Sequence, residues 1–530
     1  MSWKRYFNMF AKRDPDETHF ILGVDLGNDS SSLAFYNPMR KTAEILDISG
    51  GYGRASSPTV VQFLPDNNEW VFGEYAVLNN GDGRELTFAN IMSKLGNSEY
   101  VNVGARSFSI EKLLSLYLKE FIGGIRNINP KAEIAGIIAS VNGYLSADAR
   151  KELTRAFSMA GFDGELIGLS TDRVCALSYV LYQSEFFQDK RLPSRILYLD
   201  CGSRELRAAI YKIKPAADRV KSAEDRIKSA DGLEAVSEFS MFDPQLGAGE
   251  IDKSLITFLQ KRLPRENHNI QRLNSFLYQH KDMMLQKNNW RKPIKLYLNF
   301  VYPPIQITVT QAQMAELISP FRARLNNFIR ETLEKSEYNQ PTAIDSVICV
   351  GGGFEMQWLK DEIQTLFSKE TVSFFKNPKA VVAEGAAILA ARSLGVAELP
   401  FINVIDHHQI NSDLGLMIYS GSKETFLPII ERGAFWWQTA ITYKFILKQQ
   451  AEMSIDLWTR NADGERFRLA KIPLDGLNLQ SKGAKAVTRL ALDINFERFN
   501  ILKATVTDCG FGEIFPATGF TKTISLKYNI

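Results

Sequence analysis

The stretch HFILGVDLGNDSSSLAFYN, residues 19–37, decides the fold. An apolar, β-rich run leads to Gly27, the polar NDSSS follows, and LAFYN is again apolar. This order predicts a strand, a tight turn and a second strand, with Asp25 at the end of the first strand. The pattern recurs at RILYLDCGSRELRAAIYKI, residues 195–213, where Asp200 holds the position of Asp25. Two such hairpins, each followed by helix and strand, predict a duplicated α/β lobe.

The patterns around these hairpins divide the chain into parts. Helical spacing of apolar residues predicts helices at 111–126, 147–160, 357–367 and 380–394, and longer helical regions at 250–285 and 311–336. Buried strands are expected at 133–141 and 345–350. Alternating, β-branched and aromatic segments follow to the end. We therefore expect a leader at 1–19, an α/β domain at 20–394 with lobes at about 20–190 and 191–394, a linker at 395–404 and a β domain at 405–530.

The composition excludes several classes of protein. There are 63 Lys plus Arg against 60 Asp plus Glu, a net charge of +3, which argues against a protein that wraps nucleic acid. The 4 cysteines form no Cys-x-x-Cys pair, so neither a disulfide scaffold nor a zinc module is indicated, and a reducing, cytoplasmic setting is expected. The sequence contains no apolar run of about twenty residues, so no membrane span is expected.

Three turns in the sequence could hold phosphate. The first follows Asp25, the second follows Asp200, and the third is Gly351 to Gly353, which enters a helix. Turns of this kind point backbone N–H groups into a concavity that binds phosphate oxygens, and strand-end carboxylates can hold hydrated Mg²⁺. One such turn alone is most simply an ordinary hairpin turn. Three in one chain favour a phosphate site.

The order of these motifs resembles that of the DnaK-type seventy-kilodalton heat-shock chaperones, within the actin-like ATPase superfamily. GVDLGNDSSSLA is similar to the first phosphate motif of that family, LDCGSRELRAAIY to the second and VICVGGGFEMQWLKDEIQTLF to the adenosine motif. LGAGEID and NPKAVVAEGAAILAA also have counterparts in the same order. In the β domain, TFLPIIERGAFWWQTAITYKF and LALDINFERFNILKATVTD resemble segments of the family's peptide-binding β-sandwich.

The resemblance implies an α/β fold with a two-lobed actin-like ATPase domain around a central cleft, followed by a β-sandwich domain. It implies ATP or ADP with Mg²⁺ as cofactors, and unfolded or extended polypeptide, a protein partner or co-chaperones as partners. Asp25 and Asp200 would be the catalytic residues and would hold Mg²⁺ through water. The implied nucleotide contacts are Gly27, Asn28, Asp29, Gly202, Ser203, Arg204, Gly247, Lys281, Gly351, Gly352, Gly353 and Phe354. No helical segment follows the β domain, so a helical lid is not expected.

Departures from the family's motifs leave hydrolysis open. In the second phosphate motif, Ser203 and Arg204 replace glycines, Glu205 replaces a phosphate-contacting threonine, and Arg207 replaces an aspartate. The family's catalytic lysine aligns with Met92, while Lys94 lies two residues further on. Elsewhere Asn142 replaces a relay proline, Asp172 is a stand-in for a metal-linked glutamate, and Glu355 replaces a stacking arginine, with Phe354 as an alternative platform. The first hypothesis is an ATP-binding chaperone, and the second is a pseudo-ATPase that acts as an adaptor.

Other candidates are weaker. His407-His408 could bind metal, but a solvated loop is the simpler interpretation. Phe435-Trp436-Trp437 could line an apolar peptide groove or form part of the core. The segment 218–230 repeats at a seven-residue step and is expected to be solvated.

Overall fold

The computed structural model describes residues 19–49, 53–78, 86–142, 145, 147–183, 193–215, 233–264, 272–278, 293–336, 338, 340–396, 402–405, 410, 412–420, 423–431, 441–448, 454–460, 464–477, 487–498, 501–512 and 516–527. The chain divides into two compact units. The first comprises Met1–Val236, Met241–Glu334 and Tyr338–Ile405, and the second comprises Ser237–Ser240, Lys335–Glu337 and Asp406–Ile530. The leader, Lys281, the 218–230 repeat, His407-His408 and Phe435-Trp436-Trp437 lie outside the described residues.

The first sheet of the first unit is built on the hairpin at the start of the chain. Its strand order is β11 (Leu166–Thr171), β10 (Glu133–Val141), β1 (His19–Leu26), β2 (Ser30–Asn37) and β3 (Thr42–Ile45), and β4 (Ser57–Pro58) pairs with β2. β1 is antiparallel to β2 and parallel to β10, and β10 is parallel to β11. Apolar residues buried on both faces of the β1 and β10 strands explain why they pair in the centre of the sheet.

The second sheet repeats this arrangement. Its order is β18 (Val372–Phe374), β17 (Ser346–Val350), β12 (Arg195–Cys201), β13 (Leu206–Pro215), β14 (Leu233–Asp243) and β19 (Ile402–Ile405). β12 is antiparallel to β13 and parallel to β17, and β17 is parallel to β18. The two sheets therefore share the strand order and directions of their central part, in agreement with the duplicated hairpins in the sequence.

One strand lies where the sequence analysis placed only a linker. β19 pairs in parallel with β14 at the edge of the second sheet, although its residues belong mostly to the predicted linker at 395–404. The reason is that its sequence, INVI, is too short for a period-2 pattern to be recognised, while its β-branched residues suit an edge strand.

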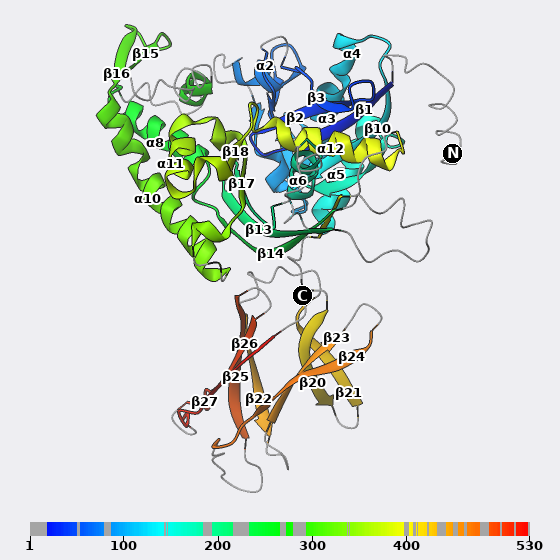
Figure 1. The fold of residues 1–530 in the computed structure, drawn as a ribbon, viewed down its shortest axis with the longest axis vertical. Helices are drawn as coiled ribbons and strands as arrows, with labels where there is room; N and C mark the ends of the chain where they lie inside the picture. The colour runs from blue at the N-terminus through cyan, green and yellow to red at the C-terminus, as the bar shows by residue number, and fades with distance from the viewer. Residues whose placement is uncertain are drawn as a thin grey trace. The chain divides into compact units, whose positions relative to one another are not determined.

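Helices cover the two sheets, and α12 (Ala380–Ser393), which lies across the first sheet in Figure 1, has most of its residues buried. Its residues are mostly small, and it lies against β1 and α6 (Asp172–Gln183). A Cβ at Gly23 of β1 would overlap with Ala383 O, and one at Gly385 would overlap with Cys175 O. Glycine at both positions therefore allows backbones to approach closely.

The remaining helices are α2 (Gly73–Leu78), α3 (Ile110–Gly123), α4 (Ile125–Ile128), α5 (Ala147–Ala160), α8 (Gly249–Gln260), α10 (Gln311–Lys335) and α11 (Gln357–Leu366). Of these, α5, α10 and α11 agree closely with the sequence predictions, α3 and α4 divide the predicted helix 111–126, α8 ends well before residue 285, and α2 was not predicted. Short 3₁₀ turns are η1 (Ile91–Lys94), η5 (Pro341–Ala343), η6 (Gly352–Glu355) and η7 (Lys369–Thr371). Small sheets are formed by β5 (Val61–Leu64), β6 (Glu69–Phe72) and β7 (Leu86–Phe88), by β8 (Tyr100–Val103) and β9 (Arg106–Ser109), and by β15 (Ile294–Leu298) and β16 (Ile305–Val309). None of the helices that the structure describes has both the length and the apolar character needed to cross a membrane.

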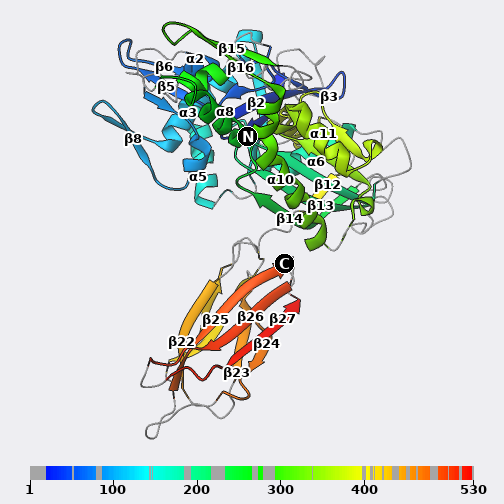
Figure 2. The ribbon, with the colours of Figure 1, turned by 90° about the vertical axis from the view of Figure 1, so that its left-hand side faces the viewer.

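The second unit contains two antiparallel four-stranded sheets. One has the order β21 (Lys423–Ile430), β20 (Asp413–Ser420), β23 (Ser454–Arg460) and β24 (Arg466–Pro473). The other sheet has the order β22 (Ile441–Lys448), β25 (Val487–Arg498), β26 (Ile501–Asp508) and β27 (Thr521–Lys527), and its four strands are seen next to one another in Figure 2. Alternate residues of the central strands are buried, such as Leu490, Leu492 and Ile494 of β25. This period-2 burial is compatible with the predicted sandwich.

Candidate functional site

A cavity of about 480 Å³ in the first unit collects the residues that the sequence analysis singled out. β1 and β12 both end at it, and each delivers one carboxylate, Asp25 or Asp200. Eleven of the fourteen predicted site residues line the cavity: Asp25, Gly27, Asn28, Asp29, Asp200, Gly202, Ser203, Arg204, Gly351, Gly352 and Gly353. The duplicated hairpins thus bring two sequence-distant turns to one place.

Three predicted residues are not among the lining. Gly247 lies beneath the second turn, where a Cβ would overlap with the backbone of Ser203 and Arg204. Phe354 is fully buried and packs against Phe374, with 6.2 Å between the ring centroids, so its ring faces the core and not the cavity. The sequence analysis expected this ring to stack on a bound nucleotide, because a side chain beside a Gly-rich turn can point toward the cavity or toward the core. Lys281 lies outside the described residues.

The second turn is tight and firmly held. The Gly202 N–H donates to Glu205 O over 3.0 Å and closes a four-residue hairpin turn between β12 and β13. The first N–H groups at the start of α8, from Ala248 and Gly249, donate to Gly202 O and Ser203 O, each over 2.8 Å. These donors would otherwise lack a partner within the helix. These two N–H groups at the start of α8 therefore support the turn, although Ala248 itself lines the cavity.

The third turn requires glycine for packing. Gly351 has a φ of +87°, and a Cβ there would overlap with Asp200 Oδ1. A Cβ at Gly353 would overlap with Cys201 Sγ, and one at Gly352 with the Lys379 side chain. At Gly202, by contrast, the nearest atom to an added Cβ would be Glu205 O at 3.6 Å. The third turn thus lies in direct contact with the end of β12.

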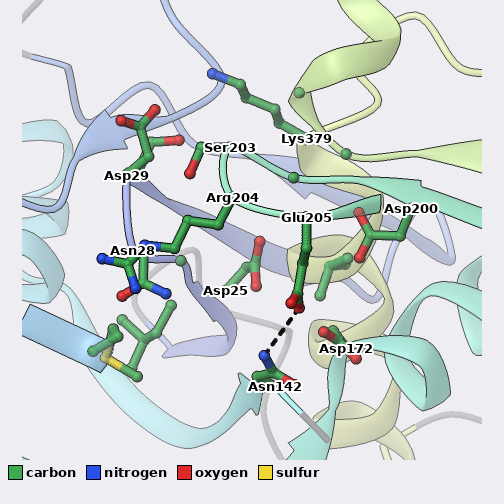
Figure 3. A pocket seen from close by; sticks show the side chains of 18 of the residues that line it. Asp25, Asn28, Asp29, Asn142, Asp172, Asp200, Ser203, Arg204, Glu205 and Lys379 are labelled. Atoms are coloured by element: carbon green, nitrogen blue, oxygen red, sulfur yellow. Dashed lines mark hydrogen bonds between the residues drawn. The ribbon is translucent and has the colours of Figure 1, made fainter. Parts of the chain in front are cut away.

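Four carboxylates and one guanidinium form the floor of the cavity, and we call them the carboxylate cluster: Asp25, Asp172, Asp200, Glu205 and Arg207 (Figure 3 labels the four acids). Arg207 Nε donates to Glu205 Oε1 over 2.5 Å, Nη1 donates to Asp172 Oδ2, and Nη1 lies 3.7 Å from Asp200 Oδ2. The Arg207 side chain is only 13% exposed. One buried cation therefore contacts acids from α6, from β12 and from the β12–β13 turn.

Burial alters the acidity of the strand-end carboxyls. Desolvation raises the pKa of Asp25 to about 7, although Ser140 Oγ donates to Asp25 Oδ1 over 2.5 Å and opposes the rise. Desolvation likewise raises the pKa of Asp200, against the attraction of Arg207. Both acids therefore exchange protons near neutral pH, which is a common property of functional sites.

Arg204 and Lys379 are two further cations in the lining. Among the described residues, no carboxylate lies within ion-pair distance of either one. In Figure 3 the Arg204 side chain extends toward Asn28, away from Asp200. Asn28 Oδ1 is buried and has no hydrogen-bond partner in the described part of the chain. This part of the cavity has unused polar groups, and its cations suit an anionic ligand.

The resemblance expects a catalytic lysine in the cavity at or near Met92, and the structure shows which residues of this segment line the cavity. Met92 lines the cavity together with Ser93 and Leu95, whereas Lys94 is not in the lining. The sequence analysis missed Lys379, which precedes α12. Its neighbour Pro378 accepts a hydrogen bond from the Gly351 N–H over 3.0 Å, which places Lys379 at the third turn. The segment NPKAV carries no local signal for this contact.

The described residues do not fit a directly bound divalent cation. No group of three or more His, Cys, Asp or Glu side chains in the described ranges is arranged to hold a metal ion. Asp172, Asp200 and Glu205 contact Arg207 instead. Asp25 accepts a hydrogen bond from Ser140 Oγ. Glycine-rich turns, and the cations Arg204 and Lys379 with no acidic partner in the described part of the chain, suit the phosphates of a nucleotide. The expectation that Asp25 and Asp200 hold Mg²⁺ through water stays a prediction.

An open cavity between two sheets of equivalent topology, entered by glycine-rich turns, is typical of α/β proteins that bind small anionic ligands. Residues 44–265 match the C-terminal part of a Family of unknown function (DUF5716), and residues 409–527 match a Domain of unknown function (DUF8552). Neither match covers half of the chain.

Curated relatives point in one direction. The chain is 23% identical to the Chaperone protein DnaK of Thermosipho melanesiensis over 77% of this chain and 65% of the relative. It is 21% identical to DnaK of Thermosipho africanus over 94% and 79% of the two chains, and 21% identical to DnaK of Mycoplasmoides gallisepticum over 69% and 59%. The chain thus spans about two thirds of the first relative's length. These similarities support a distant relationship to the DnaK chaperones.

Proposed function

We propose that this protein is a divergent DnaK-like chaperone that binds ATP or ADP in the cavity of its first unit. The observation that carries the proposal is the pair of cations, Arg204 and Lys379, which line the cavity without an acidic partner among the described residues. Charged donors of this kind bind phosphate oxygens strongly. The backbone turns at Gly27 and at Gly351 to Gly353 add close-approach surfaces for the same phosphates.

The second unit would bind extended, apolar polypeptide, and the nucleotide state would change its affinity. Large apolar side chains are exposed on three of its strands: Ile418 (41%), Ile446 (60%) and Phe467 (56%). Exposed apolar groups on strands suit contact with a peptide chain. The relationship to proteins named as chaperones supports this role. A cytoplasmic location fits the scarcity of cysteine.

A second candidate is a pseudo-ATPase that binds nucleotide without hydrolysing it and serves as an adaptor. Two observations favour it. Met92 occupies the lining where the resemblance expects a catalytic lysine, and the guanidinium of Arg207 lies among the acids that would organise a metal ion. Phosphoryl transfer depends on positive charge placed around the reacting phosphate. Loss of the lysine would reduce turnover more than binding.

Calorimetric titration of ATP and ADP into the full chain tests the nucleotide site. We expect binding, and we expect Arg204→Gln and Lys379→Gln each to weaken it about tenfold, the loss of one charge-assisted hydrogen bond. Arg106→Gln is the matched control, because Arg106 is exposed on β9 and outside the cavity lining. Absence of binding, or equal loss in all three variants, would refute the site.

Single-turnover hydrolysis on the same preparation separates the two candidates. Turnover that falls in Asp200→Asn supports the ATPase chaperone, and binding without turnover supports the adaptor. A fluorescent extended apolar peptide, titrated with and without ATP, tests the coupling. A peptide affinity that does not change with nucleotide would contradict the chaperone role.

A further inference from the structure

Arg207 lies among acids that would otherwise need a cation from solution to balance their negative charge. Without it, the four acids of the carboxylate cluster would face one cavity with no positive charge among them. Buried carboxylates that are not neutralised are costly, and proteins compensate for them with a cation or with protons. Arg207 meets this need with two short contacts, to Asp172 and Glu205, and a third at 3.7 Å to Asp200.

The charge that Arg207 contributes is permanent. A guanidinium does not lose its proton in proteins, and its donors form a rigid fork that suits several carboxylates at once. A divalent cation, by comparison, must be taken up from solution and loses most of its water only reluctantly. A guanidinium in this position also repels a second cation. The absence of a three-ligand metal group among the described acids agrees with this.

From this arrangement we propose that the guanidinium of Arg207 takes the place of a divalent cation, so that the cavity binds the phosphates of a nucleotide without a metal ion. Arg207 offsets part of the negative charge at the floor through its contacts with Asp172, Asp200 and Glu205. Arg204 and Lys379, which have no acidic partner among the described residues, receive the phosphates themselves. This inference rests on the proposed nucleotide site and adds to it the form of the ligand: free ATP or ADP, not its magnesium complex.

The glutamate beside Arg207 supports the same assignment. Glu205 Oε1 accepts from Arg207 Nε over 2.5 Å and from Asn142 Nδ2 over 3.5 Å, which links the β12–β13 turn to the end of β10 in the other sheet (dashed line in Figure 3). The guanidinium is therefore fixed on both its Nε and Nη1 sides. A side chain held in this way cannot move aside for a metal ion without breaking two contacts.

Titration of ATP and ADP into the full chain in EDTA and in excess Mg²⁺ tests the proposal. We expect dissociation constants in EDTA that equal those in Mg²⁺ or are smaller. Binding in Mg²⁺ that weakens tenfold or more in EDTA would refute the role of Arg207 while leaving the nucleotide site intact. No binding in either buffer would refute the nucleotide site itself.

Two variants make the result specific to Arg207. Arg207→Asp should convert the site to metal-dependent binding, at least tenfold tighter in Mg²⁺ than in EDTA, whereas Arg106→Asp, the same charge change on β9, should behave as the wild type. Arg207→Lys keeps the positive charge and should remain independent of Mg²⁺. If Arg207→Asp does not fold, the comparison of wild type with Arg207→Lys in the two buffers still decides the question, because dependence on Mg²⁺ in either would overturn the proposal.

Discussion

The contact between Arg207 and Asp172 can be measured as a coupling free energy. We consider Arg207→Met, Asp172→Asn and the double variant. Methionine keeps a long unbranched chain and removes only the guanidinium. Breaking one partner of a buried ion pair costs about 3–5 kcal/mol. Because Arg207 and Asp172 are 13% and 11% exposed at a cavity wall, water reaches them and we expect the lower end, about 3 kcal/mol.

The single change at Asp172 should cost less. Arg207 keeps Glu205 and Asp200 as partners in that variant, so about 1–2 kcal/mol is expected. In the double variant the carboxylate that Arg207→Met would leave unpaired is gone, so the coupling free energy should be about 2 kcal/mol. The pair is nearly buried, and salt screens such pairs weakly, so the coupling should persist at high ionic strength.

Urea unfolding followed by far-ultraviolet circular dichroism is the appropriate assay. All helices that the structure describes lie between Gly73 and Ser393, so the helical signal reports on the first unit and is not mixed with unfolding of the second. A coupling below about 0.5 kcal/mol, or one abolished by salt, would mean that the ion pair is exposed or absent in solution. The charge arrangement proposed for the cavity would then be wrong.

Three further predictions concern single positions. Asp25→Asn should stabilise the protein, by about 2 kcal/mol more at pH 8 than at pH 5 in urea unfolding. The reason is that the pKa of Asp25 is raised to about 7, so the wild type loses stability as the pH rises toward 7. An equal effect at both pH values would contradict this. Gly351→Ala should cost about 2 kcal/mol or more of stability and lower Tm by several degrees, since φ is +87° and the added Cβ overlaps with Asp200 Oδ1. The control Gly202→Ala should be nearly neutral, because its added Cβ has room. Similar Tm values for the two variants would refute the turn geometry. Burial would raise the pKa of Asp508, but hydrogen bonds from Thr488, Thr518 and Gly510 outweigh it and lower the pKa. Asp508→Asn should therefore cost the second unit about 2 kcal/mol at pH 7 in calorimetry. This cost should begin to shrink as the pH falls below the ordinary pKa of about 4 and be lost as it falls through the lowered pKa of the folded protein; a cost that does not change with pH would contradict this.

The sequence was sufficient for features that depend on neighbouring residues. Apolar period and turn-forming residues located β1, β2, β12 and β13, and the equivalent positions of Asp25 and Asp200 followed from the repeat. The bounds of α5 and β10 were also correct, because a continuous periodic pattern marks both of their ends. Parallel pairing then brought the strand ends together, since equivalent strands of each sheet end at the same edge.

Features that depend on distant residues could not be predicted. Arg207 and Asp172 are 35 residues apart and on different elements, so the sequence identified Arg207 only as a replacement and not as the partner of three acids. Lys379 lies in the cavity because of a backbone contact between Pro378 and Gly351, which no local pattern encodes. For Phe354, the packing of Phe374 decides that the ring turns inward, and that neighbour comes from another strand.

Two of the departures from the DnaK-like motif, Glu205 and Arg207, are linked because their side chains contact each other. Arg207 stands where the resemblance expects an aspartate, and Glu205 stands where it expects a threonine; each alone would alter the charge of a nearly buried site. In the structure they contact each other over 2.5 Å, so the negative charge introduced at Glu205 offsets part of the positive charge introduced at Arg207. A buried charge without a partner destabilises the fold, so the two replacements also preserve the stability of this region. The paired replacement therefore leaves a polar, intact cavity whose electrostatics are organised around an arginine, as the proposed binding of phosphates without a metal ion requires.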